Sequence, residues 1–212
     1  MSFNLANVLQ VTLGGLATGS LYAVILLGVI LVFQVSKNMN FAYGSTGMIG
    51  TFTSYVLYAD FGMPVWSAVL VGIAATVLIA ALTDFLIIRR IPAQQGFDVV
   101  VTLGELLLLT ALAQILFGAS AQSYLKLLTD IPVISQRIFI NGNDVLAIVL
   151  GVAVTIGGHL LLTRTSLGVS LRAAAADSAV AQSVGIDGRG LRPAIWALSG
   201  VFVAVGAMVF AA

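Results

Sequence analysis

Long apolar stretches separated by short polar segments dominate the pattern of hydrophobic and polar positions along the chain. A helix crossing an apolar layer about 30 Å thick needs about 20 residues. Six stretches come close to this length: Val8–Gln34, Asn38–Ala59, Phe61–Thr83, Val99–Ala119, Val145–Thr163 and Pro193–Ala212. They are continuous rather than alternating, which argues against a β-barrel. We therefore expect one transmembrane domain over residues 1–212, an all-α bundle of about six spans.

The composition points to lipid as the surrounding solvent. Hydrophobic residues make up 60% of the chain, charged residues 8%, and the mean hydropathy is +1.12. Because an ordinary soluble domain carries about 25% charged residues, a soluble globule of this composition would expose apolar surface and aggregate. The net charge of +1 gives no electrostatic case for nucleic acid. The absence of cysteine and the single histidine, His159, argue against a metal site.

The basic residues predict the orientation of the spans, because cytoplasmic loops carry an excess of lysine and arginine. With the N-terminus outside, seven basic residues face the cytoplasm and two face outward. The seven are Lys37, Arg89, Arg90, Arg164, Arg172, Arg189 and Arg192, and the two are Lys126 and Arg137. The first stretch lacks the basic leader of a cleavable signal peptide, so we expect it to be retained. This orientation places an external loop at about 120–144 and a cytoplasmic loop at about 164–192.

The cytoplasmic loop predicts a helix of its own. From Leu171 it reads LRAAAADSAVAQSVGID, and four consecutive alanines favour a helix. Gly185 is placed to end this helix in the left-handed conformation, and Pro193 to occupy the first turn of the last span. The helix is not strongly amphipathic, so it suits a protein groove better than a membrane surface.

Three motifs resemble the branched-chain amino acid permeases of ABC importers, the LivH type, with their urea- and amide-transporting relatives. The first is Arg164-Thr165-Ser166-Leu167-Gly168, followed by Leu171-Arg172-Ala173, Asp177, Ala181 and Gly185-Ile186-Asp187. The second is Asn40-Phe41-Ala42-Tyr43-Gly44, similar to the family's Asn-Phe-Ala-His-Gly, and the third is Thr102-Leu103-Gly104. The resemblance covers nearly the whole chain, in order and with matching spacing.

The chain also departs from the family pattern. Tyr43 stands where the family usually has histidine, Ser45 where many members have glutamate, and Glu105 where an apolar residue or serine is commoner. These differences leave the substrate open. Family members typically continue for further spans, and the last stretch stops at Ala212 with no charged or interfacial residue after it. We therefore expect the chain to be truncated at its C-terminus.

The resemblance implies two functional regions. Residues expected along a substrate pathway are Asn40, Phe41, Tyr43, Gly44, Gly47, Thr102, Gly104 and Glu105. Residues expected to couple to an ATPase are Leu167, Gly168, Arg172, Ala173, Asp177 and Gly185.

Several of these residues also have structural interpretations. Glu105 lies inside an apolar run, where an ionised side chain costs about 2.5–3.5 kcal/mol, so it either faces a pathway or makes a structural hydrogen bond. Gly44 and Gly47 belong to a glycine repeat that permits close helix packing as well as a pathway wall. Gly15 and Gly19 form a close-packing pattern, for internal packing or a dimer seam.

The function implied by the resemblance is that of a permease subunit of an ATP-driven ABC importer in the bacterial cytoplasmic (inner) membrane. Its cargo would be branched-chain amino acids, urea or a short amide. The chain has no phosphate-loop motif, so we expect no cofactor on it and ATP with Mg²⁺ on partner ATPase subunits. Further expected partners are a second, homologous permease, an extracytoplasmic substrate-binding protein and membrane lipid.

The residues leave three other functions open and argue against a fourth. A secondary transporter or channel without an ATPase would use Glu105 for proton coupling. A sugar-type ABC permease and a purely structural subunit are further alternatives. An intramembrane enzyme is disfavoured, because the spans hold no paired carboxylates, no Ser/His arrangement and no metal-ligand spacing.

Overall fold

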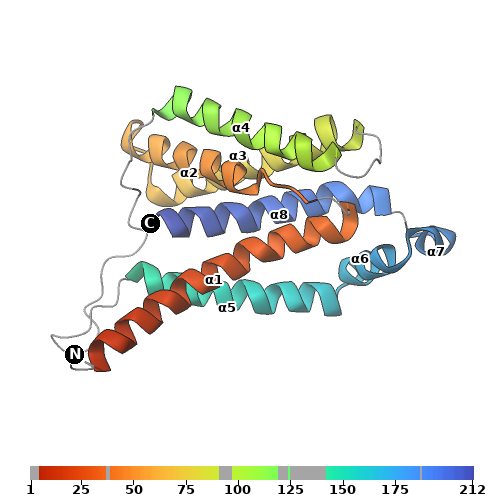
Figure 1. Cartoon of the computed structure of the whole chain (residues 1–212), viewed down its shortest axis with the longest axis horizontal. Coiled ribbons are helices and arrows are strands. Elements are labelled where there is room, and N and C mark those ends of the chain that lie inside the picture. Colours follow the sequence, from red (N-terminus) through yellow and green to blue (C-terminus); the bar gives the residue numbers. More distant parts are fainter. Residues whose placement is uncertain (1–4, 37–38, 91–96, 119–123, 125–141, 187) are drawn as a thin grey trace.

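A computed structural model describes residues 5–36, 39–90, 97–118, 124, 142–186 and 188–212 of the chain. In these ranges every regular element is helical, and the helices lie side by side as a bundle (Figure 1). The elements are α1 (Leu5–Ser36), α2 (Tyr43–Ala59), α3 (Val65–Leu82), the π-helical η1 (Thr83–Ile87), the 3₁₀-helical η2 (Ile88–Arg90), α4 (Phe97–Phe117), α5 (Gly142–Arg164), α6 (Ser166–Ala176), α7 (Ser178–Ser183) and α8 (Gly188–Ala211). The expected all-α membrane bundle is confirmed. Most of the expected external loop lies outside the described residues.

Within the described residues, five helices are long and apolar enough to cross a membrane, one fewer than the expected count of about six. The missing span is α2, which has 17 residues and a length of about 26 Å. The helix starts late because the Asn40 side chain accepts a hydrogen bond from the Ala42 backbone N–H at 2.8 Å. This bond holds a turn over 41–42 and delays the helix until Tyr43. Even so, α2 runs antiparallel to α3 along the bundle (Figure 1).

Helix α8 forms the centre of the bundle. Figure 1 shows it between α1 and α5 on one side and the layer of α2, α3 and α4 on the other. Half of its span is buried inside the protein, against a third or less of the other four spans. Its Ile195, Trp196 and Val203 are buried in the larger hydrophobic cluster. The outer α4, by contrast, exposes Leu107 and Ile115, as expected for a helix solvated by lipid.

Glycines bring the helix backbones close together at the crossings. A Cβ atom on Gly72 of α3 would lie 2.5 Å from the carbonyl oxygen of Gly50 in α2. A Cβ on Gly200 of α8 would lie 3.0 Å from the Cα of Val77 in α3. These contacts are the close approaches that small residues permit between membrane helices. The predicted packing role of the glycine repeat in α2 is therefore confirmed for Gly50.

Gly15 and Gly19 behave differently from the crossing glycines. A Cβ atom on either would meet nothing within 4 Å, and both residues are exposed on α1. Internal packing was therefore the wrong interpretation of this pair in the described part of the chain. The seam with another subunit stays a prediction.

The loop expected over residues 164–192 forms two helices, where the sequence predicted one. The chain becomes extended at Asp177, which ends α6 and begins α7, with its side chain accepting a hydrogen bond from the Val180 N–H at 3.0 Å. The predicted end at Gly185 is confirmed, because this residue has φ 84° and follows α7. Helix α8 starts at Gly188, so Pro193 lies in its second turn and not, as predicted, in the first.

Candidate functional site

A cavity of about 440 Å³ lies between α1, α2 and α8, in the size range of small-molecule sites. Its wall is mostly apolar, and none of the lining residues carries a charge. The lining residues are Ile25, Gly44, Met48, Thr51, Phe52, Tyr55, Tyr124, Ala207, Phe210 and Ala211. Hydrogen-bonding groups come from the hydroxyls of Thr51, Tyr55 and Tyr124. The cavity therefore suits a small solute that combines an apolar part with a few hydrogen-bonding groups.

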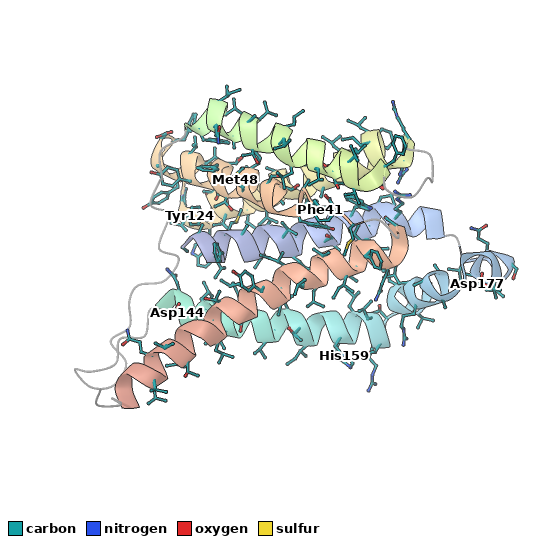
Figure 2. All side chains as sticks on the ribbon, in the orientation of Figure 1. Phe41, Met48, Tyr124, Asp144, His159 and Asp177 are labelled. Atoms are coloured by element: carbon teal, nitrogen blue, oxygen red, sulfur yellow. The ribbon has the colours of Figure 1, made fainter. Side chains whose placement is uncertain are left out.

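Tyr124 sits at the rim of this cavity, near the end of the bundle where α8 finishes (Figure 2). Its hydroxyl and that of Ser54 in α2 are 2.6 Å apart. Burial raises the pKa of the Tyr124 phenol, and the hydrogen bond to Ser54 lowers it by a smaller amount. The phenol is therefore protonated at neutral pH and serves as both donor and acceptor.

Of the expected pathway residues, Gly44 lines this cavity. Its neighbour Tyr43 is buried on another face of α2, where its hydroxyl forms a hydrogen bond with Ser199 of α8 and a longer one, 3.4 Å, to the Gly28 carbonyl of α1. A Cβ on Gly47 would lie 2.8 Å from the Ala207 Cβ, so this glycine packs against α8. Asn40 shapes the turn before α2, and Phe41 is exposed on that turn (Figure 2).

The sequence contains a periodic signal for the cavity residues of α2. Gly44, Met48, Thr51 and Tyr55 recur at intervals of four, three and four, which places them on one face of α2. The family motif drew attention to consecutive residues instead. Consecutive residues of a helix point in different directions, so a motif of neighbours cannot line one wall.

The expected residues of α4 also divide between two faces. Thr102 is buried, and its hydroxyl reaches the carbonyls of Val99 at 3.2 Å and of Met39 at 3.4 Å. Glu105, three residues later, is buried as well and forms a hydrogen bond with Thr83 of η1. Gly104 lies on the exposed face, where an added Cβ atom would meet nothing within 4 Å. None of the three lines the cavity.

The π-helical segment η1 holds a charged centre that the sequence did not indicate. Asp84 is 2% exposed and pairs with the Nε of Arg192 in α8 at 2.6 Å and the Nε of Arg89 at 2.9 Å. The wider turn of a π-helix lets consecutive residues, Thr83 and Asp84, both point inward. Arg89 therefore has a structural partner beyond its predicted role as a topology anchor. The available signal was a single acid at the end of a long apolar stretch.

The expected coupling residues lie on α6, at its junction with α7 and just after α7, at the end of the bundle opposite the C-terminus (Figures 1 and 2). Helix α6 is fastened to the bundle by Leu171, which is 1% exposed, by the half-buried Leu167 and by Gly168. Arg172 is exposed. Ala173 accepts a hydrogen bond from the Asp177 N–H at 3.1 Å, which closes the last turn of α6.

Helix α7 and the turn that follows it protrude beyond the spans and expose two valines (Figure 1). Val180 and Val184, one turn apart, are 60% and 71% exposed. A closing pair of backbone bonds, from Gly185 to Gln182 and from Ile186 to Ala181, fixes the end of the helix. Neither valine is among the residues that the sequence led us to expect at an ATPase contact. Within the described residues, no group of three His, Cys, Asp or Glu could hold a metal ion.

Known proteins resemble this chain over almost its full length. The model of the family described as "Branched-chain amino acid transport system / permease component" matches residues 11–212. A relative named "Probable branched-chain amino acid transport permease protein LivH", from Methanocaldococcus jannaschii, is 25% identical over 203 residues. That match covers 91% of this chain and 62% of the relative, so the chain spans under two thirds of the relative's length. No solved structure matches. By its sequence over residues 11–212, this chain belongs to the family of branched-chain amino acid transport permease components.

Proposed function

We propose that this chain is the membrane-spanning permease subunit of an ATP-driven ABC importer. Its cargo is a branched-chain amino acid or a related small polar solute, such as urea or a short amide, carried across the bacterial cytoplasmic membrane. The observation that carries the proposal is the α6–α7 unit: a helical pair outside the spans, packed firmly on the bundle and ending in an exposed apolar surface. Its occurrence in a chain of the transport permease family supports the same conclusion.

The packing of α6 and α7 supports a role in transmitting force. In the proposal, α7 inserts Val180 and Val184 into a groove of the partner ATPase, where burying two valine side chains contributes to binding. Leu171 anchors α6 in the hydrophobic cluster, so a push on α7 reaches the spans rather than bending the loop. The chain from α7 leads within a few residues to α8, and Arg192 joins α8 to Asp84.

The cavity supports a solute route along α2 and α8. Ala207 and Phe210 of α8 form one of its walls, so a movement of α8 changes its shape. Alternating access in the proposal consists of such movements, driven by closure of the ATPases around ATP and Mg²⁺. The remaining partners in the proposal are a second, homologous permease and an extracytoplasmic substrate-binding protein that delivers the cargo.

The test is uptake of labelled solute into vesicles that contain the complete transporter. Val180→Glu combined with Val184→Glu should abolish ATP-dependent uptake while leaving membrane insertion intact, because two acids cannot enter an apolar groove without a large desolvation cost. Phe61→Glu is the matched control, since Phe61 is 72% exposed at the other end of the bundle. Arg172→Glu tests the exposed charge of α6 separately.

Asp177 is a poor site for this test, because its side chain caps α7 and a charge reversal would also unravel that helix. Normal ATP-dependent uptake by the double valine variant would sink the coupling proposal. Uptake that persists without the ATPases and collapses with the ion gradient would instead identify a secondary transporter.

A further inference from the structure

Two buried carboxyl groups lie at the π-helical segment η1: Asp84 belongs to it, and Glu105 of α4 contacts it. Their bonding partners differ. Asp84 is paired with the guanidinium groups of Arg89 and Arg192. Glu105 has no ion pair within the described part of the chain. Its Oε1 forms a hydrogen bond with the Thr83 hydroxyl, and its Oε2 is buried with no hydrogen-bond partner there. Asp84 therefore has two cations to balance its charge, whereas Glu105, which contacts the neighbouring residue Thr83, has none in the described residues.

The hydrogen bonds of Thr83 decide which form of Glu105 fits. The Thr83 hydroxyl also reaches the Ile79 carbonyl oxygen, at 3.0 Å. A hydroxyl has one proton to donate, and both a carbonyl and an ionised carboxylate only accept. With Glu105 ionised, one of the two contacts would bring two acceptors together without a proton. With Glu105 neutral, its O–H donates to Thr83 Oγ1, and Thr83 donates to Ile79.

The surroundings of Glu105 give no support to a negative charge. Helix α2 packs against α4, and from Tyr43 to Ala59 it contains no Asp, Glu, Lys, Arg or His. The charged residues of η1 and the following η2 are Asp84, Arg89 and the exposed Arg90, and α8 carries Arg189 and Arg192. Of these arginines, Arg89 and Arg192 are bound to Asp84. The Asp84 charge has the same sign as an ionised Glu105. An ionised carboxylate without a cation is costly inside a membrane-spanning bundle.

We propose that Glu105 is a proton-binding site: it carries a proton at neutral pH in this conformation and donates it to Thr83. The bond fastens α4 to η1 without adding charge beside the Asp84–Arg192 pair. The ligand of the site is the proton itself, and the site needs no metal or solute. The protonation state of Glu105 does not depend on whether the chain couples to an ATPase.

The experiment uses a property of the sequence: Glu105 is the only glutamate among these 212 residues. Glutamate labelled with ¹³C at its side-chain carboxyl, supplied during cell-free synthesis into lipid bilayers, reports on this position. Infrared and NMR spectra of the wild-type protein at neutral pH should show the label as a protonated carboxylic acid. Glu105→Gln should remove that signal and so assign it. A label that appears as a carboxylate at neutral pH overturns the proposal.

Variants of Thr83 test the hydrogen bond itself. Thr83→Ser keeps the hydroxyl and should leave the carboxyl signal in place, whereas Thr83→Val removes the acceptor and should shift it. Identical signals in Thr83→Val and wild type would refute the bond to Thr83. Should Glu105→Gln fail to insert into the bilayer, the labelled wild-type protein still decides, because the label shows the protonation state directly from mildly acidic to mildly alkaline pH.

Discussion

Gly168 shows how closely α6 sits on the end of α5. A Cβ atom at this position would lie 2.2 Å from the carbonyl oxygen of Leu161 and 2.5 Å from that of Leu162. Both atoms belong to the backbone, so no side chain can move aside to make room. Any larger residue must push α6 away from the bundle.

We therefore expect Gly168→Ala to destabilise the protein by about 1–3 kcal/mol, the usual cost of overpacking. Gly157→Ala is the control, because a Cβ on this α5 glycine meets nothing within 4 Å and alanine favours a helix. Thermal unfolding in detergent measures both. Equal melting temperatures for the two variants would show that α6 is not packed as described.

Asp84 is the other residue on which this end of the bundle depends. Asp84→Asn leaves the guanidinium groups of Arg89 and Arg192 without their anion. Removing one partner of a buried ion pair costs about 3–5 kcal/mol, and we expect the lower end because the two arginine side chains are 36% and 22% exposed. Arg90→Gln, at an exposed neighbouring arginine, should have little effect.

Thermal unfolding of Asp84→Asn, Arg192→Gln and the double variant forms the measurement. The double variant should lose less than the sum of the two single losses, because each single change already breaks the same pair. Strictly additive losses would mean that Asp84 and Arg192 do not interact.

These residue-scale contacts show where prediction from the sequence stopped. Glu105 could be singled out, because a lone acid in an apolar run is visible in the sequence. Its partner Thr83 and the Asp84–Arg192 pair could not be found, because the partners are 22 and 108 residues apart. A π-helical turn has no sequence pattern as clear as an apolar stretch, so the inward direction of both Thr83 and Asp84 was also invisible.

Within one turn of α2, one glycine faces the cavity and another is packed tightly against α8. Gly44 faces the cavity, and a Cβ on it meets nothing within 4 Å. Gly47 faces α8, where a Cβ would lie 2.9 Å from Val203. The same substitution at the two positions therefore tests two different functions of one helix.

We expect Gly44→Leu to fold normally and to reduce uptake strongly, because leucine fills part of the cavity. Gly47→Leu should destabilise the protein by about 1–3 kcal/mol or more, because it overpacks the contact with α8. Folded yield and uptake in vesicles distinguish the two. A Gly44→Leu variant with wild-type uptake would remove this cavity from the solute route.

The elements also show why helix boundaries were predicted less well than helix positions. Apolar stretches located every long helix of the described chain, because burial in lipid requires them. The ends are set by single side chains: Asn40 delays α2, and Asp177 divides the helix predicted after Leu171 into α6 and α7. Such local bonds compete with the helix and are decided by one residue at a time.

At the scale of the whole molecule, the orientation in the membrane stays a prediction from the basic residues, and the chain allows a clean test. It contains no cysteine, so a single introduced thiol is the only reactive one. Val184→Cys and Phe61→Cys place thiols at two exposed positions, at opposite ends of the bundle. We expect a membrane-impermeant maleimide to label Phe61→Cys from outside intact cells, and Val184→Cys after the cells are opened.

Labelling of Val184→Cys in intact cells would invert the orientation and place α7 out of reach of a cytoplasmic ATPase. Labelling of both positions from outside would mean that the helices between them do not cross the membrane as described. In the inverted orientation, Tyr124 and the cavity would open toward the cytoplasm instead of the outside.

The whole-molecule arrangement was predictable only in outline. The apolar stretches predicted a helical bundle, and the structure confirms it. They could not predict that α8 is central, because all the spans are similarly apolar and lipid and protein are equally good surroundings for such helices. The cavity was hidden for the same reason, since its wall combines residues from α1, α2 and α8.

The close crossing of α8 and α3 at Gly200 has a mechanical consequence. From Arg192 to Gly200 the helix measures about 12 Å, and from Gly200 to Ala211 about 16 Å. If α8 tilts about this crossing as a rigid helix, its two ends move in opposite directions and the end farther from Gly200 moves more. A small stroke at the Arg192 end is then reversed and enlarged by about a third at the Ala211 end, where the cavity lies.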